Sequence, residues 1–136
     1  MSDLPQSALS PEELIRIQAL VVQATGGAEG VLHPEVLESA VARPFQAVFG
    51  ENLYPTPFDK AAAMAQSIAH DHPFLDGNKR SAVQAALELL FRLGYDLPLD
   101  ECVDEAEQMT LDLATARIGW QEFSAWLQAR ARPLAE

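Results

Sequence analysis

The sequence predicts an all-α fold, a compact bundle of helices with at most a small hairpin. Apolar residues recur at the three- and four-residue spacing of helices along most of the chain, and no alternating run is long enough to predict a convincing strand. The 136 residues suit one domain over residues 1–136, with residues 1–9 as a loose lead-in. An apolar fraction of 49% is ordinary for a globular protein, so we expect the chain to bury its own core.

Capping signals predict where the first two helices begin and end. Residues 10–13, Ser-Pro-Glu-Glu, place an N-cap serine, a proline at the first helical position and a glutamate three residues after the cap. This helix should end at Gly26 and Gly27, and after a loop Pro34 should open a shorter helix that ends at Pro44. The residues of the first helix expected to face the core are Leu14, Ile17, Leu20, Val21 and Ala24.

An alanine-rich helix from Pro57 to about Asp71 is predicted to be the central element. Thr56 can cap it, and its small side chains let a neighbouring helix approach closely. The polar, turn-rich residues 50–56 before it predict an exposed loop. Further helices are expected over residues 82–93, after Asp100 as a possible N-cap, and from about residue 119. The buried stripe of the first of these is predicted to be Val83, Ala86, Leu87, Leu90 and Phe91.

An imidazole, a carboxylate, a glycine turn and two cations lie close together between the two central helices, in residues 72–80, His-Pro-Phe-Leu-Asp-Gly-Asn-Lys-Arg. A glycine turn that leads into a helix leaves backbone N–H groups unpaired at the positive end of the helix dipole. Lys79 and Arg80 add full charges there, and Lys79 is one of only two lysines in the chain. The segment therefore predicts an anion pocket. The competing interpretation is that Lys79 and Arg80 are an ordinary solvated pair that binds no anion.

Two other side chains of this segment suit transfer of a phosphate-containing group to a hydroxyl. Histidine is the side-chain type whose ordinary pKa lies near neutrality, so His72 can accept the proton of an attacking hydroxyl, although a lone histidine is often only a cap or a core residue. Asp76 is an oxygen ligand of the kind that Mg²⁺ prefers, or else the N-cap of the next helix. Asn78 either fixes the loop or donates to a phosphate oxygen. A transition-metal site at His70 and His72 is weakly predicted, because no third ligand accompanies them.

The pattern of residues 72–80 resembles the signature of Fic-fold enzymes, and Lys79 resembles the death-on-curing (Doc) toxin branch of that family. The resemblance covers roughly residues 9–128. It implies the Fic-fold helical bundle, with ATP and Mg²⁺ as nucleotide and metal. It also implies catalytic roles for His72 and Asp76, with Asp76 as the metal ligand, and a flap before the central helix that docks the target by strand addition. The flap residues are Leu53 and Tyr54, and the nucleotide-binding residues are Gly77, Asn78, Lys79 and Arg80.

By this resemblance the chain is a Doc-like toxin of a toxin–antitoxin pair, which transfers the γ-phosphoryl group of ATP to a hydroxyl on a translation protein. The implied target is elongation factor Tu. AMP or nucleotidyl transfer is the alternative: Gly77 favours it, whereas Val83 opposes it, because AMP-transferring relatives carry a second arginine at that position. A third possibility is a catalytically silent regulatory binding module.

Residues 25–30, Thr-Gly-Gly-Ala-Glu-Gly, match the letters of the inhibitory helix of Fic-fold enzymes, whose glutamate blocks the γ-phosphate site. Two consecutive glycines strongly disfavour a helix, so we expect a loop at this point. Restraint must then come from a separate antitoxin chain.

The excess of acidic residues makes nucleic acid and membrane surfaces poor partners. The formal net charge is −11, whereas both surfaces attract basic patches. No apolar run approaches the length of a membrane span and the first residues lack a signal-peptide core, so a cytoplasmic location is expected. The single cysteine, Cys102, has acidic neighbours that disfavour a reactive thiolate.

Overall fold

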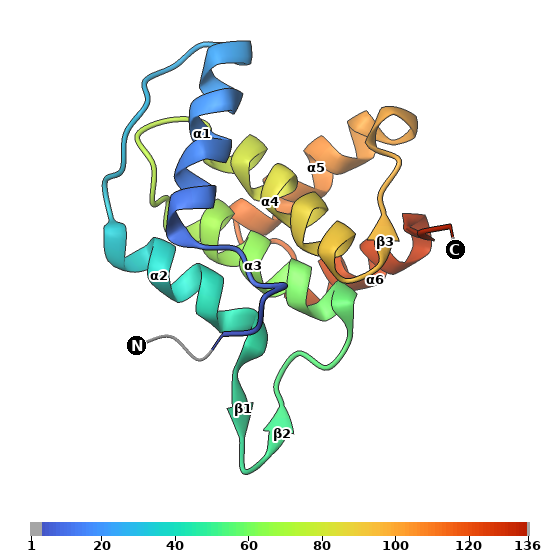
Figure 1. Ribbon diagram of the computed structural model, residues 1–136. Helices are drawn as coiled ribbons and strands as arrows, with labels where there is room; N and C mark the ends of the chain where they lie inside the picture. Colours follow the sequence, from blue (N-terminus) through green and yellow to red (C-terminus); the bar gives the residue numbers. More distant parts are fainter. Residues whose placement is uncertain (1–3, 136) are drawn as a thin grey trace.

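The computed structural model describes residues 4–135, and helices dominate them (Figure 1). This confirms the predicted all-α fold. The predicted lead-in falls partly outside the described residues, but its last residue, Leu9, is buried in the core. The α-helices are α1 (Pro11–Thr25), α2 (Pro34–Ala42), α3 (Pro57–Asp71), α4 (Asn78–Arg92), α5 (Val103–Ala114) and α6 (Trp120–Arg130).

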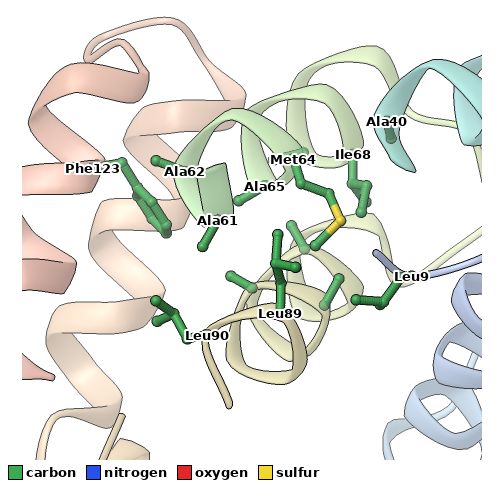
Figure 2. Close-up of a cluster of buried hydrophobic side chains, with 14 of the residues drawn as sticks. Leu9, Ala40, Ala61, Ala62, Met64, Ala65, Ile68, Leu89, Leu90 and Phe123 are labelled. Atoms are coloured by element: carbon green, nitrogen blue, oxygen red, sulfur yellow. The ribbon is translucent and has the colours of Figure 1, made fainter. Parts of the chain in front are cut away.

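Helix α3 is the central element, as its alanine content predicts. It packs against α2, α4, α5 and α6, and its closest partner is α4. The alanines on its buried face have no exposed surface, so the two helices meet with little side-chain volume between them. Figure 2 shows Met64 and Ile68 of α3 filling the space between α3, Leu89 of α4 and Leu9.

Short elements complete the chain. The 3-10 turn η1 (Arg43–Phe45) follows α2, and strands β1 (Ala47–Val48) and β2 (Glu51–Asn52) form a hairpin that projects from the bundle (Figure 1). This hairpin begins earlier than the loop predicted at residues 50–56. Strand β3 (Tyr95–Asp96) pairs with β4 (Arg132–Pro133), and η2 (Leu99–Glu101) precedes α5.

The capping box of α1 also belongs to an ion-pair network that joins α1 to α4. Ser10 accepts from the Glu13 N–H, and Glu13 accepts in turn from the Ser10 N–H. Arg92, at the end of α4, donates to Glu13, to Glu88 and to the Ala8 carbonyl. Hydrogen bonds from Arg92 are the main cause that lowers the pKa of Glu13 below its ordinary value.

Replacing Glu13 with glutamine is expected to lower the free energy of unfolding at pH 7 by about 1 kcal/mol, because the pair with Arg92 is partly exposed. A carboxylate with a lowered pKa stabilises the folded state above its unfolded pKa, and this contribution disappears as the pH falls through the folded pKa. The free energies of unfolding of wild type and Glu13→Gln, measured with urea, should therefore converge as the pH falls from about 4.3, the ordinary pKa of glutamate, through the lowered pKa of Glu13. A difference that stays constant down to acid pH would contradict this assignment.

Candidate active site

The loop between α3 and α4 carries the predicted site, and two left-handed residues shape it. His72 ends α3 with a φ of +50°, and Gly77 begins α4 with a φ of +75°. A Cβ at Gly77 would lie 3.2 Å from Cγ1 of Val22 and 3.3 Å from Cγ1 of Val21. The backbone therefore favours glycine here on two grounds, its conformation and the close approach of α1.

His72 and Asp76 both expose their side chains, while the residues between them anchor the loop. Pro73 and Phe74 are buried, and Phe74 is only 1% exposed. Asn78 closes the loop from within: its Oδ1 accepts from the Phe74 N–H at 3.0 Å, and its Nδ2 donates to the Phe74 carbonyl at 3.1 Å. This is the loop-fixing role weighed for Asn78, and contact with a phosphate stays a prediction.

Helix α4 begins without a side-chain cap, which differs from the possible N-cap role of Asp76. The N-cap position is Gly77, and the first intrahelical bond runs from Ser81 N–H to the Gly77 carbonyl. Lys79 and Arg80 are exposed in the first turn. Arg80 has a distant ion-pair partner, Glu107 of α5, at 3.9 Å. The structure thus places two exposed cations at the electropositive end of a helix, next to the loop that carries His72 and Asp76.

Asp76 can hold a divalent cation with one of its two oxygens. Oδ2 accepts from the backbone N–H of Ala28 at 2.7 Å, and Oδ1 accepts no hydrogen bond from residues 4–135. The described residues contain no cluster of three or more histidine, cysteine, aspartate or glutamate side chains that could hold a metal. This donor set fits Mg²⁺, which binds through one or two carboxylates together with substrate phosphates. His70 pairs with Asp71 instead of with His72.

An apolar groove of about 530 Å³ runs beside Arg80, between α1, α4 and α5. It explains why two residues predicted for the core are exposed: Leu20 is 60% exposed and Ala24 is also exposed. Val83 lies in the same groove. Phe91 of α4 was also predicted to be buried; it is exposed, and it does not line the groove. The groove is lined by Ile17, Leu20, Val21, Ala24, Thr25, Arg80, Val83, Gln84, Glu88, Leu99, Val103, Ala106 and Glu107.

The β1–β2 hairpin is the predicted flap, and its two predicted docking residues differ in accessibility. Leu53 is exposed. The ring of Tyr54 is buried against Trp120, and its hydroxyl accepts from Nε of Arg43 at 2.9 Å. Tyr54 therefore anchors the flap with its ring buried, and its contact with a target stays a prediction. Phe49, at the hairpin tip, is fully exposed with a φ of +53°.

Arg43 and Lys60 fix the base of the flap. Arg43 also donates to the Ala63 carbonyl and to Ser67 and Gln66 of α3. Lys60 donates to the Tyr54 carbonyl, and burial lowers the pKa of its ammonium group. The flap base is thus attached to the same helix that ends at His72.

The glycine-rich residues 26–30 form a loop, as predicted, and not an inhibitory helix. Glu29 is exposed and accepts from Gln23 of α1 at 3.4 Å. Cys102, far along the chain, is buried in the core, and this burial raises the pKa of its thiol. In the part of the chain that the structure describes, no helix is both long and apolar enough to cross a membrane.

The geometry defines a class of protein: an all-α domain in which one loop, anchored between two central helices, presents a histidine, an aspartate and a cationic helix start. A family model described as Fic/DOC family matches residues 8–90 of this chain. The chain belongs to the Fic/DOC family.

Two relatives are similar over most of their length. One, named Toxin Doc, comes from Mycolicibacterium smegmatis; it is 45% identical over 92 residues, which are 68% of this chain and 71% of the relative. The other, named Protein kinase doc, comes from Escherichia phage P1; it is 32% identical over 113 residues, 81% of this chain and 84% of the relative. The resemblance seen in residues 72–80 is therefore confirmed at the level of the family and its Doc branch.

Proposed function

We propose that this chain is a Doc-like toxin that transfers the γ-phosphoryl group of ATP to a hydroxyl on a protein target. The observation that carries the proposal is the α3–α4 loop, where an exposed histidine, an exposed aspartate and the cationic start of α4 belong to one anchored segment. The names Toxin Doc and Protein kinase doc support it. A translation protein, elongation factor Tu by resemblance, is the proposed target, and the cytoplasm the proposed location.

In this reaction His72 accepts the proton of the target hydroxyl as its oxygen attacks the γ-phosphorus. A new O–P bond forms, the bond to the β–γ bridging oxygen breaks, and ADP leaves. Lys79, Arg80 and the free N–H groups of α4 hold the phosphates. Asp76 would hold Mg²⁺, which supplies charge neutralisation when bound. Catalysis of this kind depends mainly on position and charge, which an anchored loop supplies.

AMP transfer is the second candidate, and two features of the structure weaken it. Gly77, the residue that favours it, is explained by its left-handed backbone and by the nearness of Val21 and Val22. Val83, where AMP-transferring relatives carry an arginine, lines the apolar groove. The intact mass of a modified target separates the reactions: we expect about 80 Da added for phosphate, and about 329 Da would establish AMP instead.

An antitoxin chain is the proposed restraint, because the glycine-rich loop does not form an inhibitory helix. The groove beside Arg80 is apolar and bordered by Glu88 and Glu107, which suits an amphipathic segment with basic flanks. Leu20→Arg should leave growth arrest intact but prevent neutralisation by the co-expressed antitoxin. Neutralisation equal to wild type would place the antitoxin elsewhere.

A further inference from the structure

Gln18 is a buried polar residue that the sequence analysis did not single out. It lies on α1 and is only 1% exposed. Its Nε2 donates to the Ala28 carbonyl at 3.0 Å and to the Asp76 carbonyl at 3.0 Å, and its Oε1 accepts from the Gly30 N–H at 3.4 Å. One side chain thus joins α1 to both the glycine-rich loop and the loop of the candidate active site.

The glycine-rich loop runs directly along the α3–α4 loop, and both pass beside α1 (Figure 1). Leu75 N–H donates to the Gly30 carbonyl at 3.0 Å, and Val31 forms an isolated bridge with Phe74. Two of the glycines permit the approach: a Cβ at Gly27 would lie 3.0 Å from Cβ of Asp76, and one at Gly30 would lie 2.6 Å from Cδ1 of Leu75.

We infer that Gln18 is a positioning residue for Asp76, and that it acts through the glycine-rich loop. Gln18 fixes the backbone of Asp76 directly, and it fixes Ala28, whose N–H holds one oxygen of the Asp76 carboxylate. The Asp76 carboxylate is then held in one orientation, with Oδ2 bound to Ala28 and Oδ1 accepting no hydrogen bond from the described residues. The inference rests on the proposed function, because it assigns to Gln18 a share of the phosphoryl transfer in which Asp76 takes part.

The side-chain amide of Gln18 has the number of donors and acceptors that its three backbone partners require. It has two N–H donors and a carbonyl acceptor, and all three functions are used. Methionine has nearly the same length and helix propensity but offers no such groups, so Gln18→Met removes the bonds and keeps the packing. The three backbone groups would then lose their partner in a partly buried setting.

The first experiment measures amide hydrogen exchange by NMR in the full chain without ligands. In Gln18→Met the amides of Ala28, Gly30 and Leu75 should exchange at least about tenfold faster, while amides of α3 keep their protection. Gln23→Met is the matched control, since Gln23 is an exposed glutamine on the same helix whose bond goes to Glu29. Unchanged exchange in Gln18→Met would overturn the inference.

A second pair of variants acts on Asp76 without touching α1. Gly27→Ala pushes a Cβ against Asp76, whereas Gly26→Ala meets nothing within 4 Å, and both glycines have positive φ angles, +115° and +90°. The chemical shift of the Ala28 amide, which reports its hydrogen bond to the Asp76 carboxylate, should change in Gly27→Ala and stay at the wild-type value in Gly26→Ala. This pair keeps the inference testable if Gln18→Met does not fold, and equal resonances in the two variants would contradict it.

Kinetics separate positioning from a merely structural role. Gln18→Met and Gly27→Ala should lower kcat by about tenfold to a hundredfold and change KM for ATP by a much smaller factor, because Lys79, Arg80 and the N–H groups of α4 still bind the phosphates. Wild-type kcat combined with fast exchange at Ala28 would overturn the inference. A wild-type chain that transfers no group at all would overturn the proposed function instead, and the Ala28 amide alone would then decide whether Gln18 positions Asp76.

Discussion

Replacing His72 with alanine is expected to abolish growth arrest and to lower the rate of target labelling by about 10²- to 10⁴-fold, the usual contribution of a general base. The imidazole is exposed at the end of α3, so its loss opens no cavity. The free energy of unfolding should therefore change by no more than about 0.5 kcal/mol. The loss of growth arrest is measured as growth of cells that express each variant. The labelling rate is measured as radiolabel transfer from γ-labelled ATP.

His70→Ala is the matched control for this experiment. His70 is an exposed histidine in the last turn of the same helix, and its ring pairs with Asp71. Its removal should leave labelling and growth arrest at the wild-type level. If His72→Ala also keeps wild-type labelling, the chain is not a histidine-dependent transferase, and the interpretation as a silent binding module gains support.

Local signals predicted the helices well because each is a short-range physical preference. The serine and threonine caps with following prolines begin α1 and α3 where expected, since cap and proline act within one turn. The alanines of α3 predicted its central position, because small side chains stabilise a helix chiefly when a second helix packs closely against them. The Asp100 region was less well predicted: α5 begins at Val103, after a 3-10 turn.

Contacts between distant segments limited what the sequence could predict about the site. Leu20 fits the apolar spacing of α1 as well as Leu14 does, yet Leu14 is buried and Leu20 lines the groove, because spacing does not reveal how far a neighbouring helix extends. Gln18 lies on the same helix and carries no local signal of burial. Its three partners lie 10, 12 and 58 residues away in the chain.

The anchoring of the loop divides the motif into two kinds of residue. Phe74 and Asn78 hold the backbone, while His72, Asp76, Lys79 and Arg80 remain exposed at its surface. Reactive groups placed on an anchored loop reach a substrate without ordering the loop first, so less free energy is lost on binding. A motif of nine residues therefore contains both the proposed chemistry and the support for it.

Replacing Phe74 with alanine should test that division from the structural side. The side chain is one of the largest that are fully buried, so its loss should lower the free energy of unfolding by about 3–5 kcal/mol, a large part of the roughly 5–15 kcal/mol of a domain. Urea unfolding measures this as a lower midpoint with an unchanged slope. Phe74→Leu, which keeps most of the volume, should lose only about 1 kcal/mol.

The comparison of Phe74→Ala with His72→Ala is the informative one. Below its unfolding midpoint Phe74→Ala retains every exposed group of the site and the bonds of Asn78 to the backbone of residue 74. Its labelling rate should still fall, because the loop loses its apolar anchor, whereas His72→Ala loses the rate and keeps the stability. A folded Phe74→Ala with wild-type labelling would mean that the hydrogen bonds of Asn78, Gln18 and Gly30 hold the loop without the ring.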